Sequence, residues 1–282
     1  MRVLRTSSVR VLDEHDREAV HGLLDADPVG NVFVSSRVRA TGLNTARLGA
    51  ELWGYVEQGG IASLCYSGAN LVPVNAGPTA VRKFAERARE RGRRCSSIVG
   101  PIPAVNDMWD RLRPAWGPAR TIRANQPVLE LSEYPAVEPD TRVRQVQPHE
   151  LSILYPACVA MFTEEVGVPP DSGDGGALYR ARIAELVRSG RALARIENGR
   201  VVFKAEIGAV TPYACQIQGV WVHPEHRGQG HAVHGMAAVA RWALSGVAPR
   251  ATLYVNDFNT PARAAYRRVG FREVGAVMSV LF

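Results

Sequence analysis

Residues 220–232 read VWVHPEHRGQGHA, and this stretch decides the fold of the C-terminal half of the chain. The apolar run at 217–222 has the length and composition of a buried strand, and Pro224 ends it. The apolar residues that follow the loop recur at helical spacing: Val233, Met236, Ala237, Ala240 and Leu244. We therefore expect a strand, a short loop containing Gly228 and Gly230, and a helix that begins at about Gly230.

A strand, a glycine loop and a helix N-terminus together are suited to binding an anion. The amides of the first helical turn lack partners within the helix, and the helix dipole is positive at this end. Glycines let a phosphate approach the backbone closely. The loop is not a Walker motif, because no Gly-Lys-Ser/Thr follows, and it does not have the G-x-G-x-x-G pattern of dinucleotide-binding folds.

The loop resembles the acetyl-CoA pyrophosphate loop of the GCN5-related N-acetyltransferases (GNAT). Their pattern, Gln/Arg-x-x-Gly-x-Gly/Ala, is matched by Arg227, Gly230 and Ala232, and the preceding Val-x-Val-x-Pro is present at 220–224. Residues 259–271, NTPARAAYRRVGF, resemble the family's Asn-x-x-Ala-x-x-x-Tyr-x-x-x-Gly-Phe segment. The two motifs occur in the right order, so residues 142–282 are identified as similar to a GNAT acetyltransferase domain.

The resemblance implies how acetyl-CoA is bound. Strand 217–222 carries a bulge that opens a gap from the next strand, at 252–255, and the pantetheine arm lies in that gap. The residues implied to contact the cofactor are Val220, Trp221, Val222, Arg227, Gly228, Gln229, Gly230, His231, Ala232, Val233 and Asn259. Asn259 has an equally good alternative role as the cap of the helix that follows it.

The resemblance also implies that Tyr266 is the general acid that protonates the leaving thiolate; the alternative is a core aromatic residue. No glutamate lies on the strands beside the loop, so the general base is less defined. Glu206 ranks first, because a carboxylate within an apolar strand needs a role or a partner, and Lys204 on the same face could be that partner. Glu164 and Glu165 are candidate substrate contacts, and catalysis through ordered water remains open.

The remaining chemistry-bearing residues do not form a recognisable site. Four histidines fall between 223 and 234, but a loop directed at a pyrophosphate cannot easily bring their rings together on one metal, so we expect no metal. The cysteines at 65, 95, 158 and 215 are scattered singly, which argues against a disulfide framework, a zinc site and a cysteine nucleophile.

The composition is that of a soluble globular protein with two domains or one large one. The chain has 282 residues with a net charge of +7, and its basic residues are mostly dispersed arginines, so we expect no nucleic-acid partner; a phosphate-rich CoA ligand itself favours positive charge. No signal peptide or run of 18 apolar residues is present, which predicts a cytoplasmic protein without membrane contact.

The order of predicted elements is repeated in the two halves. Each half has helix, strand meander, helix, strand, helix and strand, although residues 29–50 show no sustained period. We expect an α+β (mixed α/β) protein of two GNAT-like domains, each with a mostly antiparallel mixed sheet flanked by helices. The predicted boundaries are 1–131 for a degenerate first copy, 132–141 for a linker rich in proline and acidic residues, and 142–282 for the acetyltransferase domain. At the place of the phosphate loop the first half has only NAGPT, residues 75–79.

These features predict an acetyl-CoA-dependent N-acetyltransferase that transfers the acetyl group directly to a primary amine. The irregular stretch at 163–176 is the expected entrance for this acceptor, whose identity the sequence does not define. Two alternatives stay open: a catalytically silent acetyl-CoA-binding regulator, and a Fem-like aminoacyl transferase, which the CoA loop disfavours. The expected state is a monomer with two packed halves or a homodimer.

Overall fold

The computed structural model describes residues 8–57, 59–170 and 176–282. The chain divides into two compact units that are not contiguous in sequence. Unit 1 consists of residues up to Val128 with Tyr254–Phe258 and Val274–Phe282, and unit 2 consists of Leu129–Leu253 with Asn259–Glu273. The C-terminal strand therefore packs with the N-terminal residues, a feature that a division at 131 and 142 does not contain. Those sequence-based boundaries stay a prediction.

Unit 1 is built on a sheet with the strand order β1-β2-β3-β4-β5-β12-β6. Its elements are β1 (Ser8–Val11), α1 (Arg17–Asp25), α2 (Val32–Thr41), α3 (Thr45–Leu48), β2 (Glu51–Glu57), β3 (Gly60–Ser67), β4 (Asn70–Val74), α4 (Pro78–Arg91), β5 (Ser97–Pro101), α5 (Ile102–Trp116), β6 (Thr121–Leu131) and most of β12 (Arg272–Leu281). Strands β1 to β4 are antiparallel neighbours, β4 and β5 are parallel, and β12 is antiparallel to β5.

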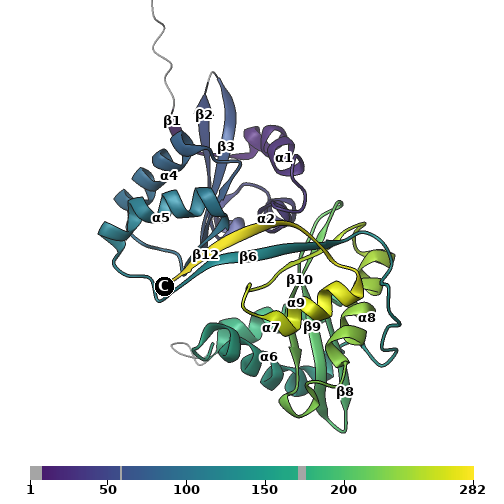
Figure 1. Cartoon of the computed structure of the whole chain (residues 1–282). Coiled ribbons are helices and arrows are strands. Elements are labelled where there is room, and N and C mark those ends of the chain that lie inside the picture. The colour runs from purple at the N-terminus through teal and green to yellow at the C-terminus, as the bar shows by residue number, and fades with distance from the viewer. Residues whose placement is uncertain (1–7, 58, 171–175) are drawn as a thin grey trace, which may run out of the picture. The chain divides into compact units, whose positions relative to one another are not determined.

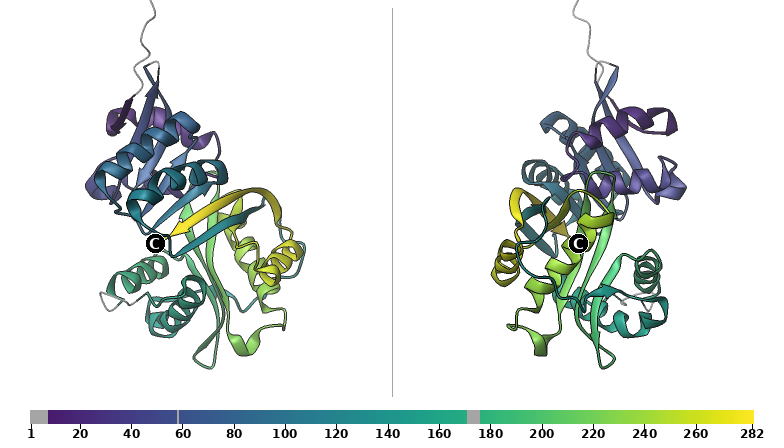
Figure 2. Two further views of the ribbon diagram at one scale, coloured as in Figure 1. Left: turned by 60° about the vertical axis from the view of Figure 1, so that its left-hand side comes forward. Right: turned by 90° about the vertical axis from the view of Figure 1, so that its right-hand side faces the viewer.

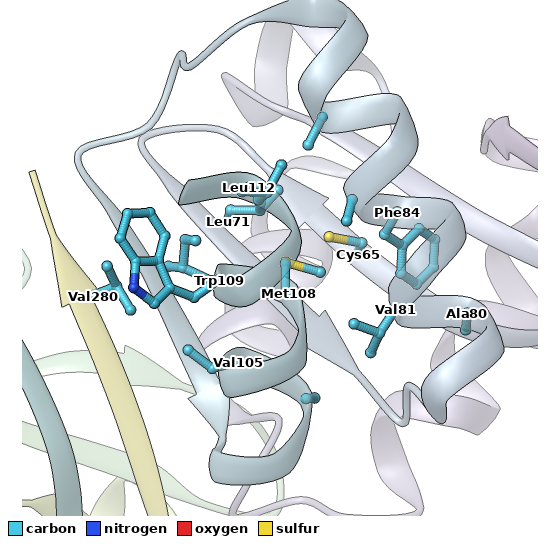
Figure 3. Packing of buried hydrophobic residues seen from close by; sticks show 14 of the residues in the cluster. Cys65, Leu71, Ala80, Val81, Phe84, Val105, Met108, Trp109, Leu112 and Val280 are labelled. Carbon is cyan, nitrogen blue, oxygen red and sulfur yellow. The ribbon is translucent and has the colours of Figure 1, made fainter. Parts of the chain in front are cut away.

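Helices cover both faces of this sheet (Figure 1). Alternate strand residues Trp53, Cys65 and Leu71 pack under α4 and α5 together with Met278 and Val280 of β12. Figure 3 shows Cys65, Leu71 and Val280 beside the residues of the two helices. Their neighbours Leu52, Leu64 and Val72 face α1 and α2. This alternation with a period of two is the pattern expected for strands buried on both faces. The first half of the chain thus forms a complete hydrophobic core with the help of the C-terminal strand.

The strands of unit 2 follow one another in the sheet order β11-β10-β9-β8-β7. Its elements are β7 (Arg144–Gln145), α6 (Leu151–Val166), α7 (Ala177–Arg188), β8 (Ala192–Glu197), β9 (Arg200–Val210), β10 (Cys215–Val222), α8 (His231–Gly246), β11 (Ala251–Tyr254) and α9 (Thr260–Val269). Helices α6 and α7 pack against each other and bury Leu154, Cys158 and Leu186 against the strands. Helices α8 and α9 also pack together (Figure 2). A Cβ atom on Gly235 of α8 would lie 2.7 Å from the ring of Phe203 in β9, so glycine lets this helix approach the strand closely.

The two units repeat one element order, and the repeat extends to single residues. In each unit the chain turns from the first strand into a 3₁₀ turn through a capping box, Asp13 with Asp16 in unit 1 and Gln147 with Glu150 in unit 2. In each unit, the acidic residue that closes the box pairs with an arginine six positions before it, at 2.6 Å in both cases: Asp16 with Arg10, and Glu150 with Arg144. The predicted fold class, two GNAT-like domains with mixed, mostly antiparallel sheets, is confirmed.

Two further sequence expectations are refined. Residues 29–50, which lack a sustained period, form α2 and α3. The predicted linker 132–141 is not free along its whole length, because Asp140 donates its amide to the carbonyl of His234 at 2.9 Å. No helix in the described residues is both long and apolar enough to span a membrane.

Candidate functional site

Strand β10 carries a bulge at the place that the resemblance implied. Its pairing with β9 shifts register between Gln218 and Trp221, so that Gly219 and Val220 form the bulge. Gly219 adopts φ +60°, a left-handed conformation that favours glycine. On the other side, the parallel pairing of β10 with β11 is limited to Cys215 with Ala251 and Gln216 with Thr252. The expected bulge and the divergence of the two strands are therefore both present.

The loop after β10 presents backbone amides without partners. Gly228 and Gly230 take left-handed conformations with φ of +76° and +84°, and Gly230 is the N-cap of the 16-residue helix α8 without a side-chain cap. Within the described part of the chain, no hydrogen-bond acceptor is recorded for the amides of residues 228–232. Free amides at the positive end of a long helix form an anion-binding site.

Glu164 bridges two residues of the predicted cofactor site. It accepts a hydrogen bond from Nε1 of Trp221 at 3.1 Å, and its other oxygen is 2.7 Å from the guanidinium of Arg227. Arg227 also donates from Nε to the carbonyl of Val222 at 3.1 Å. Helix α6 ends at the left-handed Gly167, so Glu164 and Glu165 lie on its last turn. Residues 171–175 of the predicted acceptor entrance lie outside the described residues, and contact of either glutamate with the acceptor stays a prediction.

Tyr266 and Asn259 lie on α9 and at its start. Tyr266 is 6% exposed, and its ring makes a T-shaped contact with Phe271 at 6.1 Å. Burial, with the negative charge of Glu165 as a second cause, raises the pKa of the Tyr266 phenol, so the hydroxyl keeps its proton at neutral pH. Asn259 accepts a hydrogen bond from the amide of Ala262 at 3.2 Å, which confirms its capping role. Its contact with a cofactor stays a prediction.

Glu206 lies on β9 beneath the bulge and is 3% exposed. Its Oε1 atom is 2.6 Å from Nζ of Lys204, which is fully buried, and 3.6 Å from Sγ of Cys158. A Cβ atom on Gly219 would lie 3.0 Å from the Glu206 carboxylate, so glycine lets the bulge pass this close. Burial disfavours the charged form of Lys204, but the neighbouring carboxylate raises its pKa, so Lys204 keeps its charge. The predicted pairing is confirmed, and the role of Glu206 as a base stays a prediction.

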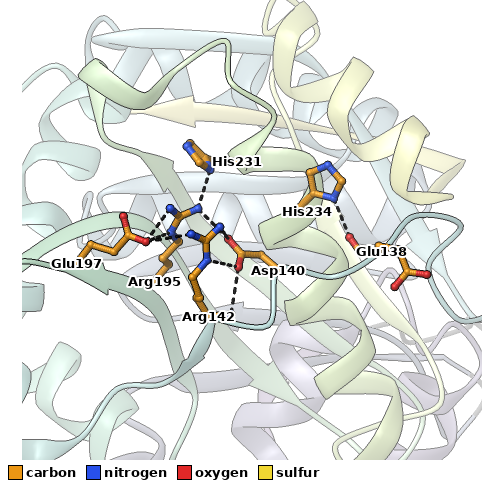
Figure 4. Close-up of polar contacts among 7 residues, drawn as sticks. All are labelled: Glu138, Asp140, Arg142, Arg195, Glu197, His231 and His234. Carbon is orange, nitrogen blue, oxygen red and sulfur yellow. Dashed lines mark hydrogen bonds and ion pairs between the residues drawn. The ribbon is translucent and has the colours of Figure 1, made fainter.

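The histidines beside the loop form a row in which each ring contacts the next, and the rings do not surround one common point. The rings of His223, His226 and His231 are each 5.7 Å from the next in T-shaped contacts. His223 accepts the amide of Glu225 on Nδ1, and Nδ1 of His231 is 3.0 Å from the guanidinium of Arg195 (Figure 4). Among the described residues, no group of three or more potential ligands is arranged to hold a metal ion.

Sequence reasoning missed Arg195 and Asp140. The Arg195 side chain is 7% exposed and pairs with Asp140 at 2.9 Å and with Glu197 at 2.7 Å. The only sequence signal for it is an arginine in the interior of the apolar run ALARIE of β8. Its partner Asp140 is 55 positions away, in the segment predicted as a linker, and no periodicity could connect the two.

Family models match two parts of the chain. Residues 169–271 match the acetyltransferase (GNAT) family, and residues 50–154 match a domain of unknown function, DUF4081. A search of curated proteins found no significant match. The GNAT match includes β10, the loop, α8 and the Tyr266 segment, and therefore the geometry described above.

Solved structures resemble the chain over nearly its whole length. An acetyltransferase of the GNAT family from Colwellia psychrerythraea is 13% identical with a TM-score of 0.58, and the match covers 98% of this chain and 99% of that one. A GCN5-related N-acetyltransferase from Sphaerobacter thermophilus is 19% identical with a TM-score of 0.59, covering 97% and 94%. A tandem GNAT protein from the clavulanic acid biosynthesis pathway is 15% identical with a TM-score of 0.52, covering 98% of each chain. At these identities the likeness shows the fold.

Proposed function

We propose, from the match of residues 169–271 to the acetyltransferase (GNAT) family, that the protein transfers an acetyl group from acetyl-CoA directly to a primary amine. The observation that carries the proposal is the combination of a bulged β10, diverging from β11, with unpartnered amides at residues 228–232. A backbone built in this way holds an extended ligand with an anionic end, which is the chemistry of CoA.

The residues present fit such a ligand. The amides of residues 228–232 and the dipole of α8 would hold the pyrophosphate, and the bulge at Gly219 and Val220 leaves strand amides and carbonyls for the pantetheine arm. Acetyl-CoA would supply the activated thioester. Orienting the donor and the amine is the larger part of the catalysis proposed here, since such positioning lowers a barrier by roughly 7–11 kcal/mol.

Tyr266 is the proposed general acid. Its raised pKa keeps the hydroxyl protonated, and the phenol can give its proton to a departing thiolate, which then leaves as a thiol. The position of Tyr266 on α9, the helix that follows β11, comes with the motif that the chain shares with the family. No tyrosine occurs in α5, the corresponding helix of unit 1.

Glu206 is the proposed base, and Lys204 holds it in place. An alkylammonium with a pKa of about 10 must lose a proton before it attacks, and a carboxylate fixed by Lys204 can receive that proton through water. The approach to the carboxylate passes Gly219, which has no side chain to block it. The alternative is that ordered water alone removes the proton from the amine, and the experiment must distinguish this route from one that needs Glu206.

Calorimetric titration of acetyl-CoA into the wild type and into Gly230→Pro tests the proposal. Proline cannot adopt the φ of +84° at this position and has no amide, so at least a hundredfold loss of affinity is expected. Gly77→Ala is the matched control, because Gly77 is the N-cap of α4, has a negative φ and has open space around it. Absence of binding by the folded wild type would overturn the proposed cofactor.

The buried pairing of Glu206 favours a second candidate, an acetyl-CoA-binding regulator without turnover. A carboxylate engaged by a fully buried lysine could be a structural ion pair with no catalytic role. An acceptor screen that follows CoA release separates the two functions. Release that depends on an amine and is lost in Glu206→Gln supports the enzyme, whereas tight binding without release across the screen supports the regulator.

A further inference from the structure

The first side chain of α8 has a buried partner that no motif contains. Arg195 reaches from β8 to His231, with a distance of 3.0 Å between the guanidinium and Nδ1 (Figure 4). The same guanidinium is held by Asp140 at 2.9 Å and by Glu197 at 2.7 Å, and Asp140 is itself held by Arg142 at 3.0 Å. Arg195 therefore has a fixed place, and its charge is balanced within the network.

The chemistry of arginine determines the state of His231. A guanidinium has only donors, so the contact is a hydrogen bond only if Nδ1 of His231 accepts. The imidazole is then neutral, and its proton is on Nε2. His234, one turn further along α8, is the opposite case, because its Nδ1 lies 2.7 Å from the carbonyl of Glu138 and must donate.

We propose that Arg195 is a positioning residue for cofactor binding: it holds His231 as the neutral Nε2–H tautomer, so that the start of α8 adds a side-chain donor to its free amides. This inference rests on the proposed function. A phosphate oxygen accepts hydrogen bonds from both kinds of group, and a neutral donor binds it without taking up a proton.

Among the described residues, four charged or titratable groups act on His231: Arg195 from β8, Asp140 and Arg142 from the segment before β7, and His226 from the loop. Glu197, also from β8, pairs with Arg195. The two arginines and two carboxylates cancel in charge. Burial and then the positive charge of Arg195 lower the pKa of His231, which agrees with the tautomer that the geometry requires.

The first test needs no cofactor. Long-range ¹H–¹⁵N NMR of the histidine-labelled protein should give the Nε2–H pattern for His231 and the Nδ1–H pattern for His234, with His231 titrating below the ordinary value of about 6.5. In Arg195→Met the His231 titration should move to higher pH and the tautomer preference should be lost. Arg142→Met is the matched control, because Arg142 contacts Asp140 and Glu197 as Arg195 does but acts on His231 only through its charge. It should move the His231 titration less than Arg195→Met does and should leave the tautomer preference unchanged.

The second test measures acetyl-CoA affinity from pH 5.5 to 8. For Arg195→Met, about three- to tenfold weaker binding is expected at pH 8, with recovery as the pH falls and His231 becomes a cation; His231→Phe should lose the donor without recovery. If Arg195→Met does not fold, Arg195→Lys is measured in its place. Because lysine also has only donors, this variant should keep the Nε2–H pattern of His231. A wild-type His231 with the Nδ1–H pattern, or the same titration in Arg195→Met, overturns the inference. A wild type that shows the Nε2–H pattern but binds no acetyl-CoA overturns only the proposed function.

Discussion

The two units contain the same kind of crossing, from a strand through a loop into a helix, but the two crossings differ in length. In unit 1, β4 pairs in parallel with β5 at Asn70 and Leu71, as β10 pairs with β11 at Cys215 and Gln216. From Leu71 to the N-cap Gly77 the chain advances six positions, whereas from Gln216 to the N-cap Gly230 it advances fourteen. The additional residues are those of the bulge and the loop.

The shorter crossing has also lost the groups that would hold a ligand. Strand β4 pairs with β3 without a register shift, and Pro73 in its interior has no amide. Helix α4 begins with Pro78, which removes one donor from the first turn. The two crossings thus differ mainly in the backbone amides that are free to bind a ligand. This difference supports the proposal of a single acetyl-CoA site per chain, in unit 2.

The largest effect is expected on the proposed protonation of the leaving thiolate by Tyr266, a residue with no tyrosine counterpart in α5 of unit 1. Tyr266→Phe removes the proposed acid and preserves the packing of the ring on Phe271. A loss of about 10²–10⁴ in kcat is expected, which is the usual contribution of a positioned acid or base, with little change in the affinity for acetyl-CoA. Steady-state kinetics and calorimetry check it; Tyr179→Phe is the control, since its hydroxyl donates to the carbonyl of Cys158. An unchanged kcat would remove Tyr266 from the mechanism.

The second comparison concerns the residues beneath the bulge. The register of β2 with β3 matches that of β8 with β9, so Leu64 and Tyr66 occupy the places of Lys204 and Glu206. Lys204→Leu leaves a buried carboxylate unpaired and should lower the free energy of unfolding by about 3–5 kcal/mol. The double variant Lys204→Leu with Glu206→Leu should recover much of this loss and have no transferase activity. Denaturant unfolding measures the free energy of unfolding of both variants. An equal loss in the single and the double variant would contradict the cost assigned to the unpaired carboxylate.

The sequence predicted the local part of this architecture and could not predict the long-range part. The strand, loop and helix around Gly230 follow from apolar spacing and glycine placement, and the pairing of Lys204 with Glu206 follows from their sharing one strand face. The position of β12 beside β5 does not follow, because a strand's own pattern does not identify its neighbour. The contact of Arg195 with His231 joins residues 36 positions apart and could not be derived from spacing. Helix α2 gave no clear signal because its buried face includes the polar Ser35, whereas the apolar Phe33 lies off that face.

A smaller effect on acetyl-CoA affinity is expected from removing one of the free amides of residues 228–232. Ala232→Pro deletes one free amide at the second residue of α8, a position at which α9 already accommodates Pro261. About a tenfold to hundredfold loss of acetyl-CoA affinity is expected, since a hydrogen bond to a charged group contributes about 1.5–3 kcal/mol. Thr79→Ala, at the corresponding position of α4, should leave the affinity unchanged. A shift in the control as large as in the variant would indicate that unit 1 also contributes to binding.

The smallest effect concerns the capping boxes, which the two units share. The hydrogen bonds from Arg144 lower the pKa of Glu150 to about 2, and those from Arg10 also lower the pKa of Asp16. Because the pKa is depressed in the folded state, each pair stabilises the fold above the ordinary carboxyl pKa and loses this contribution as the pH falls through the folded-state pKa. Glu150→Gln should therefore cost on the order of 1 kcal/mol at pH 7 and less at pH 3. Denaturant unfolding at several pH values measures the difference, and Asp16→Asn should show the same trend in unit 1. A cost that does not change with pH would mean that the variant disturbs the turn itself and that the ion pair contributes little.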